Sequence, residues 1–86
     1  MDEYLKCRSV RDYRVWRAGG EAALALIEAT GQAAFFKNMA KGQLEIIAKR
    51  KADGSFYPEL VEDLELYQRE QKRWEKIAAQ YRKAAA

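Results

Sequence analysis

The sequence has 86 residues, a length typical of one folded domain, and a nearly balanced charge of 16 Lys and Arg against 13 Asp and Glu. It contains no His and a single Cys, which removes the commonest general base and metal ligand and excludes an intrachain disulfide. We therefore expect one helical domain over residues 1–86 that is not an enzyme and holds no metal or other cofactor.

The first predicted helix runs from about Val10 to Ala18. Ser9 and Asp12 have the spacing of a capping box, in which the Ser9 hydroxyl accepts a backbone hydrogen bond and the Asp12 carboxylate reaches back to the N–H of Ser9. One longer helix over Asp2–Arg17 is an alternative. Apolar residues recur here every three positions, so they drift around a helix instead of forming one stripe.

Residues 20–52 predict a long central helix with two apolar faces. On a helical wheel of about 100° per residue, one line contains Leu24, Ile27, Gly31, Phe35, Met39, Gly42 and Ile46. The nearly opposite line contains Leu26, Ala29, Ala33, Phe36, Ala40, Leu44 and Ile47. Such a helix is typically packed between partners, so we expect one face to be covered within the chain and the other by a second copy or another protein.

Because of Gly31, the sequence does not decide whether the central helix is straight or kinked. Glycine is the favoured residue just past a helix C-terminus, so Thr30-Gly31 is compatible with a kink as well as with a straight helix. Gly31 and Gly42 are also compatible with the close approach of a partner helix, because glycine has no Cβ. The central helix then ends at the turn signature Ala52-Asp53-Gly54-Ser55.

The last segment predicts a long helix after Pro58, which fits the first helical position. Its apolar positions alternate spacings of four and three residues, the seam of a coiled coil or helical bundle. The seam residues are Leu60, Leu64, Tyr67, Gln71, Trp74, Ala78 and Tyr81. Acidic residues crowd the first turns and basic residues dominate the rest, an order that suits the helix dipole.

These elements predict an all-α fold: a small bundle of a short N-terminal, a long central and a long C-terminal helix. The short connection predicts that the last two helices form an antiparallel hairpin. Apolar and aromatic side chains on these helices are candidates for a protein interface. The candidates are Phe35, Phe36, Met39, Leu64, Tyr67, Gln71, Trp74 and Tyr81.

Basic residues offer an alternative, a nucleic-acid-binding protein. Arg neutralises phosphates, and the neighbouring Tyr13 and Trp16 could stack on unpaired bases. The candidates are Arg8, Arg11, Arg14, Arg17, Lys49, Arg50 and Lys51. A spacing of three spreads the four Arg over about 180° of a helix, and the 49–51 cluster is explained by the helix dipole.

The sequence thus favours a helical protein–protein interaction module, an adaptor, regulator or inhibitor that binds through apolar helix faces. Its expected partners are a second copy, most simply in a dimer, and another protein. Accessory proteins of phages or mobile elements have this size and character. No run of 18 apolar residues and no signal pattern occurs, so we expect a cytoplasmic protein with no membrane partner.

Overall fold

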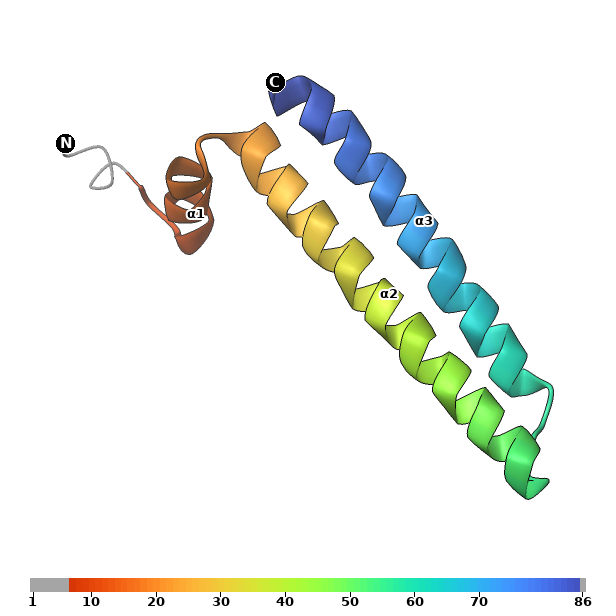
Figure 1. Cartoon of the computed structure of the whole chain (residues 1–86). Helices are drawn as coiled ribbons and strands as arrows, with labels where there is room; N and C mark the ends of the chain where they lie inside the picture. The colour runs from red at the N-terminus through yellow and green to blue at the C-terminus, as the bar shows by residue number, and fades with distance from the viewer. Residues whose placement is uncertain (1–6, 86) are drawn as a thin grey trace.

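The computed structural model describes residues 7–85, and 87% of them are helical. The helices are α1 (Val10–Ala18), α2 (Glu21–Asp53) and α3 (Glu59–Ala85) (Figure 1). α2 and α3 lie side by side and antiparallel, and α1 lies beside the first turns of α2. The molecule is elongated, 62 × 24 × 15 Å, because α2 alone extends for about 50 Å and α3 packs along it instead of stacking across it. The predicted all-α fold with an antiparallel hairpin is confirmed.

The predicted start of α1 at Val10 is confirmed, and half of the capping box forms as expected. The Ser9 hydroxyl accepts a hydrogen bond from the backbone N–H of Asp12 at 3.1 Å. The Asp12 carboxylate accepts from the backbone N–H of Arg8, at 3.2 Å, and not from that of Ser9 as predicted. Ser9 is extended, at φ −149° and ψ 166°, so the alternative of one helix over Asp2–Arg17 is wrong. Residues 2–6 of that alternative lie outside the described residues.

α2 runs for 33 residues as one continuous α-helix, so the helix does not end at Thr30-Gly31 (Figure 1). The helix begins after Gly20 and ends at Gly54, whose φ of 78° is in the left-handed region. Glycine adopts this conformation without steric penalty and is the usual residue at a helix C-terminus. Gly54 therefore terminates α2 before the turn, whereas Gly31 lies inside the helix.

The core is the seam between α2 and α3, and it consists of the second predicted apolar line of α2 and the predicted seam of α3. Its most buried apolar side chains are Ala29, Ala40, Ile47, Leu60 and Ala78. Half-buried Leu26, Ala33 and Phe36 of α2 and Leu64, Tyr67 and Trp74 of α3 extend it. Small residues at several seam positions give room for the large aromatic groups, as in other interdigitating helix pairs.

Two seam positions differ from the prediction, because Tyr81 of α3 and Leu44 of α2 are both exposed. Leu44, placed on the second apolar line, is exposed, and Gln43 is buried in its stead. The side-chain N–H of Gln43 donates to the backbone carbonyl of Leu60 at 2.8 Å. This hydrogen bond satisfies the amide inside the seam and ties α2 to the first turn of α3.

The α2–α3 connection is a tight turn held by Asp53. Its carboxylate accepts hydrogen bonds from the hydroxyl and, at 3.0 Å, from the backbone N–H of Ser55. Both bonds favour the charged carboxylate and, with a smaller contribution from the positive charge of Arg50, hold the pKa of Asp53 below its ordinary value.

Pro58 lies one position before α3 and not at its first helical residue as predicted.

We predict that Ser55→Ala raises the pKa of Asp53 toward its ordinary value, because the hydroxyl bond is the largest cause of the depression. An NMR pH titration of the Asp53 carboxyl measures the change, with Ser9→Ala as a control that leaves it unaltered. Since the folded pKa is depressed, the turn contributes stability above the ordinary Asp pKa and loses it as pH falls through the lowered value. An unchanged pKa in Ser55→Ala would contradict this account.

Candidate protein-interaction surface

The structure divides the predicted interface residues into two groups. Phe36, Leu64, Tyr67, Gln71 and Trp74 are half-buried in or beside the hairpin seam. The side-chain N–H of Gln71 donates to Glu75 at 2.9 Å, so its amide is partnered on its own helix. Phe35, Met39 and Tyr81 are exposed. Phe35 is 54% exposed, and Met39 and Tyr81 are each 38% exposed, so this second group is the more accessible to another molecule.

Phe35 and Met39 belong to a face of α2 turned away from α3, whereas Tyr81 lies near the C-terminal end of α3. We define the outer face of α2 as Ile27, Gly31, Phe35, Met39, Gly42 and Ile46, the first predicted apolar line without Leu24. Ile27 is 57% exposed, Phe35 54% and Ile46 45%. Leu24 is buried, beside Tyr13 and Ala18 of α1. α1 therefore covers only the first turns of this face, and the described residues 7–85 leave the rest largely exposed.

Phe35 is held in place by its neighbour in the seam. The rings of Phe35 and Phe36 meet edge to face, with centroids 5.2 Å apart and an interplanar angle of 82°. Such aromatic pairs contribute roughly 0.5–1.5 kcal/mol beyond the area they bury. Because Phe36 is half-buried toward α3, its contact with Phe35 restricts the rotation of the exposed Phe35 ring.

Contacts among the described residues do not account for the two glycines of the outer face, Gly31 and Gly42. A Cβ added to Gly31 or Gly42 would meet no atom within 4 Å. Each glycine in a helix interior costs about 1 kcal/mol relative to Ala. No described contact of the hairpin requires a residue without a side chain at these positions.

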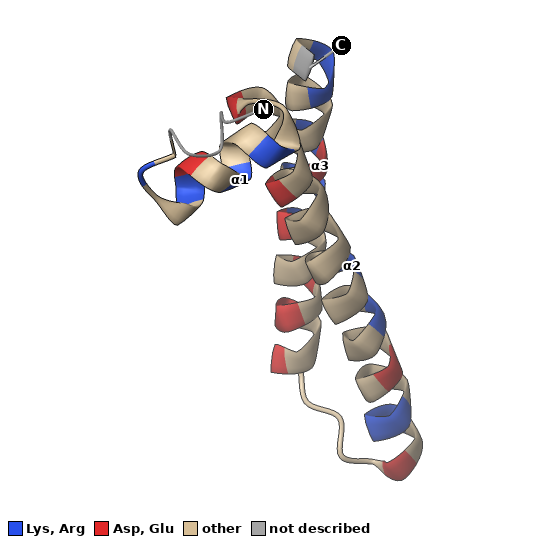
Figure 2. Cartoon of the chain, turned by 90° about the vertical axis from the view of Figure 1, so that its left-hand side faces the viewer, with Lys and Arg blue, Asp and Glu red and all other residues tan. Residues whose placement is uncertain are grey.

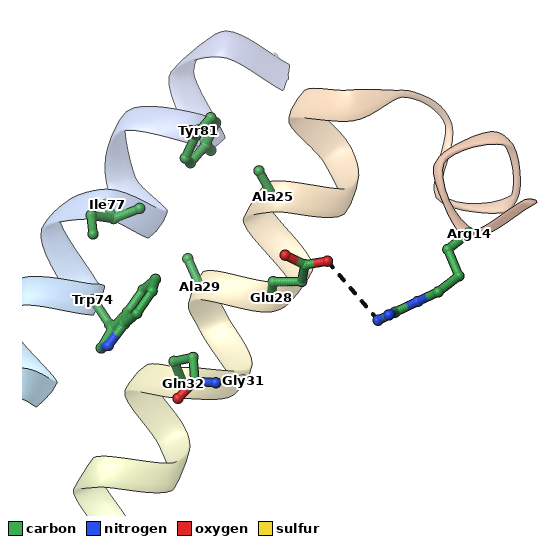
Figure 3. A pocket seen from close by; sticks show the side chains of 9 residues that line it. All are labelled: Arg14, Ala25, Glu28, Ala29, Gly31, Gln32, Trp74, Ile77 and Tyr81. Carbon is green, nitrogen blue, oxygen red and sulfur yellow. Dashed lines mark ion pairs between the residues drawn. The ribbon is translucent and has the colours of Figure 1, made fainter. Parts of the chain in front are cut away.

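A hollow of about 540 Å³ adjoins the N-terminal part of α2 (Figure 3). Trp74, Ile77 and Tyr81 of α3 line one side of it, and the small side chains of Ala25 and Ala29 lie on α2. The predicted candidates Trp74 and Tyr81 are thus brought to one site. The lining is mixed in character, because the polar side chains of Arg14, Glu28 and Gln32 complete it.

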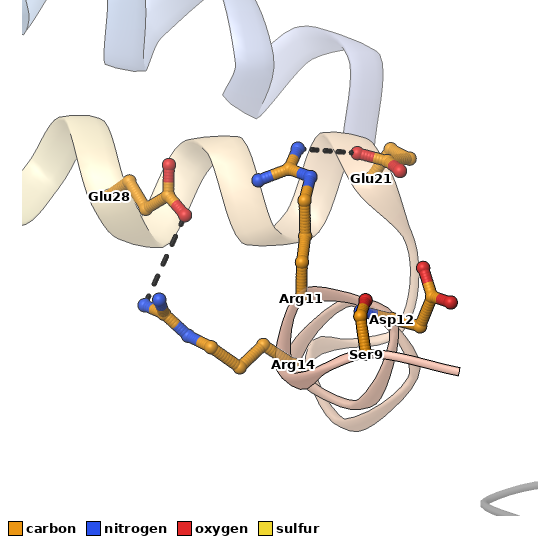
Figure 4. A network of polar contacts seen from close by, with 6 residues as sticks. All are labelled: Ser9, Arg11, Asp12, Arg14, Glu21 and Glu28. Atoms are coloured by element: carbon orange, nitrogen blue, oxygen red, sulfur yellow. Dashed lines mark hydrogen bonds and ion pairs between the residues drawn. The ribbon is translucent and has the colours of Figure 1, made fainter. Parts of the chain in front are cut away.

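The N-terminal Arg residues mostly contact their own chain (Figure 4). Arg11 forms an ion pair with Glu21 at 3.0 Å, and Arg14 lies 4.0 Å from Glu28. Arg17 donates to the hydroxyl of Tyr13 at 3.3 Å. Exposed pairs of this kind contribute about 0–1 kcal/mol each, so they orient α1 on α2 without fixing it firmly. Arg8 is exposed at the start of α1.

The basic cluster at the end of α2 also has partners in the chain. Arg50 donates to the Ser55 hydroxyl at 3.5 Å, and the Lys51 ammonium lies 5.1 Å from the centre of the Phe56 ring. Lys49 lines a shallow hollow with Ile46 and Arg50. Most of the predicted phosphate contacts are therefore engaged at the two ends of α2.

The structure also brings together basic residues that the sequence analysis did not single out. Arg69, Lys72, Arg73 and Lys76 line a hollow of about 450 Å³ on α3. Acidic residues mark the first half of α3 and basic residues its C-terminal end (Figure 2). Arg73 pairs with Glu70 at 3.1 Å and lies 5.1 Å from the centre of the Trp74 ring. Spacings of three and four residues place the four basic residues on one side of α3. From the sequence, these basic residues are explained by the helix dipole alone.

The described residues contain no group of three or more His, Cys, Asp or Glu side chains placed to hold a metal ion. No helix within residues 7–85 combines the length and the apolar character needed to cross a membrane. No protein-family model matches the chain, and comparisons with curated proteins and with solved structures found no match.

Proposed function

We propose that this chain is a helical protein–protein interaction module, an adaptor, regulator or inhibitor whose binding surface is the outer face of α2. The observation that carries the proposal is the exposure of Ile27, Phe35 and Ile46 on one uncovered face of a continuous helix. Contiguous apolar surface of this kind typically marks an interaction site. We place this function in the cytoplasm, where Cys7 stays reduced, and an accessory protein of a phage or mobile element fits its size.

The hairpin supports this function mechanically. α3 fixes the opposite face of α2, so the outer face is presented on a rigid helix and loses little conformational entropy on binding. Large apolar side chains spaced three and four residues apart are the usual anchors of a helix in a groove. Phe35, with Phe36 behind it, is the residue that we expect to dominate binding.

The alternative of nucleic-acid binding has weaker support. Arg11 and Arg14 contact acidic residues of α2, and Arg50 and Lys51 contact the turn. Phosphate binding would compete with these contacts. No observation favours a nucleic acid over the solvated and paired state of these side chains, so protein binding is the function we propose.

A photo-reactive phenylalanine analogue tests the proposal when it replaces Phe35. In cells that produce the protein naturally, illumination is expected to join position 35 covalently to a defined protein, identified by mass spectrometry. That protein is either the chain itself or a different one. The same analogue at Leu44 is the matched control, because Leu44 is also exposed but lies off the outer face.

Two results would contradict the proposed function. One is the absence of any protein adduct from position 35 under conditions in which the analogue is efficiently incorporated. The other is an equal pattern of adducts from positions 35 and 44, because random collisions do not distinguish two exposed positions of one helix.

A further inference from the structure

We propose that the outer face of α2 binds the outer face of a second copy, with the two α2 helices antiparallel and a two-fold axis between Asn38 and Met39. The inference rests on the proposed function, because it takes the same face as the binding surface. It adds the identity of the partner and the register of the contact.

The first argument is complementarity of size. In an antiparallel helix pair, two residues lie opposite each other when their residue numbers add to a constant. Phe35 with Gly42 and Ile46 with Gly31 have the same sum, so one register satisfies both pairs. The two-fold axis repeats each contact, and four large side chains then meet four glycines.

The spacing of these residues keeps them on one face. Gly31 and Gly42 are 11 residues apart, and so are Phe35 and Ile46. Eleven residues make about three turns of an α-helix, so such residues stay aligned along nearly straight helices. The register also gives the two glycines a role, because their missing side chains make space for the second copy's Phe35 and Ile46. A parallel pair would instead place Phe35 against Phe35 and glycine against glycine.

The second argument is complementarity of charge. The same register places Glu28 opposite Lys49 of the second copy. Glu28 lies 4.0 Å from Arg14, a long ion pair, and both side chains are about half exposed. Opposite charges at the edge of an interface fix orientation and register more than they add affinity.

The ends of the helices are also compatible with this arrangement. The register brings Asp53, where α2 ends, beside Leu24 of the second copy, where α1 packs. Phe56 and Tyr57 in the turn and Tyr13 in α1 are exposed. The turn of each copy therefore comes next to α1 of the other, where these aromatic side chains can cover one another.

Sedimentation velocity of the purified chain at tens of micromolar tests the inference through an exchange of large and small residues. The wild-type chain is expected to be a dimer. Phe35→Ala removes the large side chain and Gly42→Phe fills its space, so each is expected to weaken the dimer at least about tenfold. The double variant exchanges the two sizes in the same register, and it is expected to recover most of the affinity.

Two controls keep the result specific. Leu44→Ala truncates an exposed side chain off the outer face and is expected to leave the dimer unchanged. Circular dichroism and thermal unfolding of each variant show whether the hairpin is retained. Where Gly42→Phe fails to fold, Gly42→Ala serves instead: it is expected to stabilise the helix by propensity while weakening the dimer.

The outcomes separate the inference from the proposed function. A monomeric wild-type chain at 100 µM overturns the second copy as the partner, whereas an adduct from position 35 to another protein leaves the proposed function standing. A dimer that the double variant fails to restore, in a folded chain, overturns the register. A dimer weakened equally by Leu44→Ala also overturns it.

Discussion

Leu60→Ala is expected to lower the free energy of unfolding by about 2–4 kcal/mol, one of the two largest effects that the structure predicts. Leu60 is 5% exposed in the first turn of α3, where its backbone carbonyl accepts the hydrogen bond from buried Gln43. The substitution removes most of a buried side chain and leaves a cavity that the long, rigid helices cannot fill. Urea unfolding followed by circular dichroism measures the change as a lower midpoint.

Leu66→Ala is the matched control for this prediction. It makes the same chemical change on the same helix, but Leu66 is 45% exposed. Its truncation is expected to change stability by less than about 1 kcal/mol, because little buried surface is lost and Ala is a slightly better helix former. Equal losses for Leu60→Ala and Leu66→Ala would show that the seam does not lie where the structure places it.

Gln43→Glu is the second large effect, with an expected destabilisation of roughly 2–4 kcal/mol at neutral pH. The amide N–H that donates to the Leu60 carbonyl becomes a carboxylate oxygen facing the same carbonyl. The new charge is buried, has no donor in place of the lost one, and is repelled by the carbonyl dipole. Thermal unfolding at neutral pH measures the loss.

The loss in Gln43→Glu is expected to depend on pH in a defined direction. Burial and the facing carbonyl raise the folded-state pKa of the introduced Glu above its unfolded value. Stability therefore rises as pH falls through the raised pKa, because the protonated acid can again donate to the carbonyl. Gln32→Glu, at an exposed position of the same helix, is the control. A penalty independent of pH would contradict the buried hydrogen bond.

The fold was largely predictable because its long helices repeat their signals. The alternating spacing from Leu60 to Ala78 identifies one side of the seam, and Gly54 with its neighbours identifies the turn. The two apolar lines lie on opposite sides of α2, which indicates that α3 can pack against only one of them. These patterns depend on helix geometry alone, so they are readable without knowing what packs against them.

Details that depend on the partner helix were less predictable. A helical wheel favours Leu44 over Gln43 by its apolar character, and only the position of the Leu60 carbonyl explains why the amide is buried. The position of α1 depends on weak exposed pairs such as Arg11 with Glu21, which no local pattern specifies. The candidate site was predicted in part, because the sequence does not show which residues of the aromatic set α3 covers.

The hairpin topology has a consequence for how the chain folds. Contacts across the seam are closest in sequence near the turn, where Gln43 meets Leu60, and most distant at the open end, where Ala25 and Tyr81 line the same hollow. Closing from the turn adds each contact with a small further loss of chain entropy, which favours rapid folding. Residues beside the turn are thus expected to determine the folding rate of the hairpin. Residues near α1 are expected to determine how often the open end of the hairpin unfolds locally.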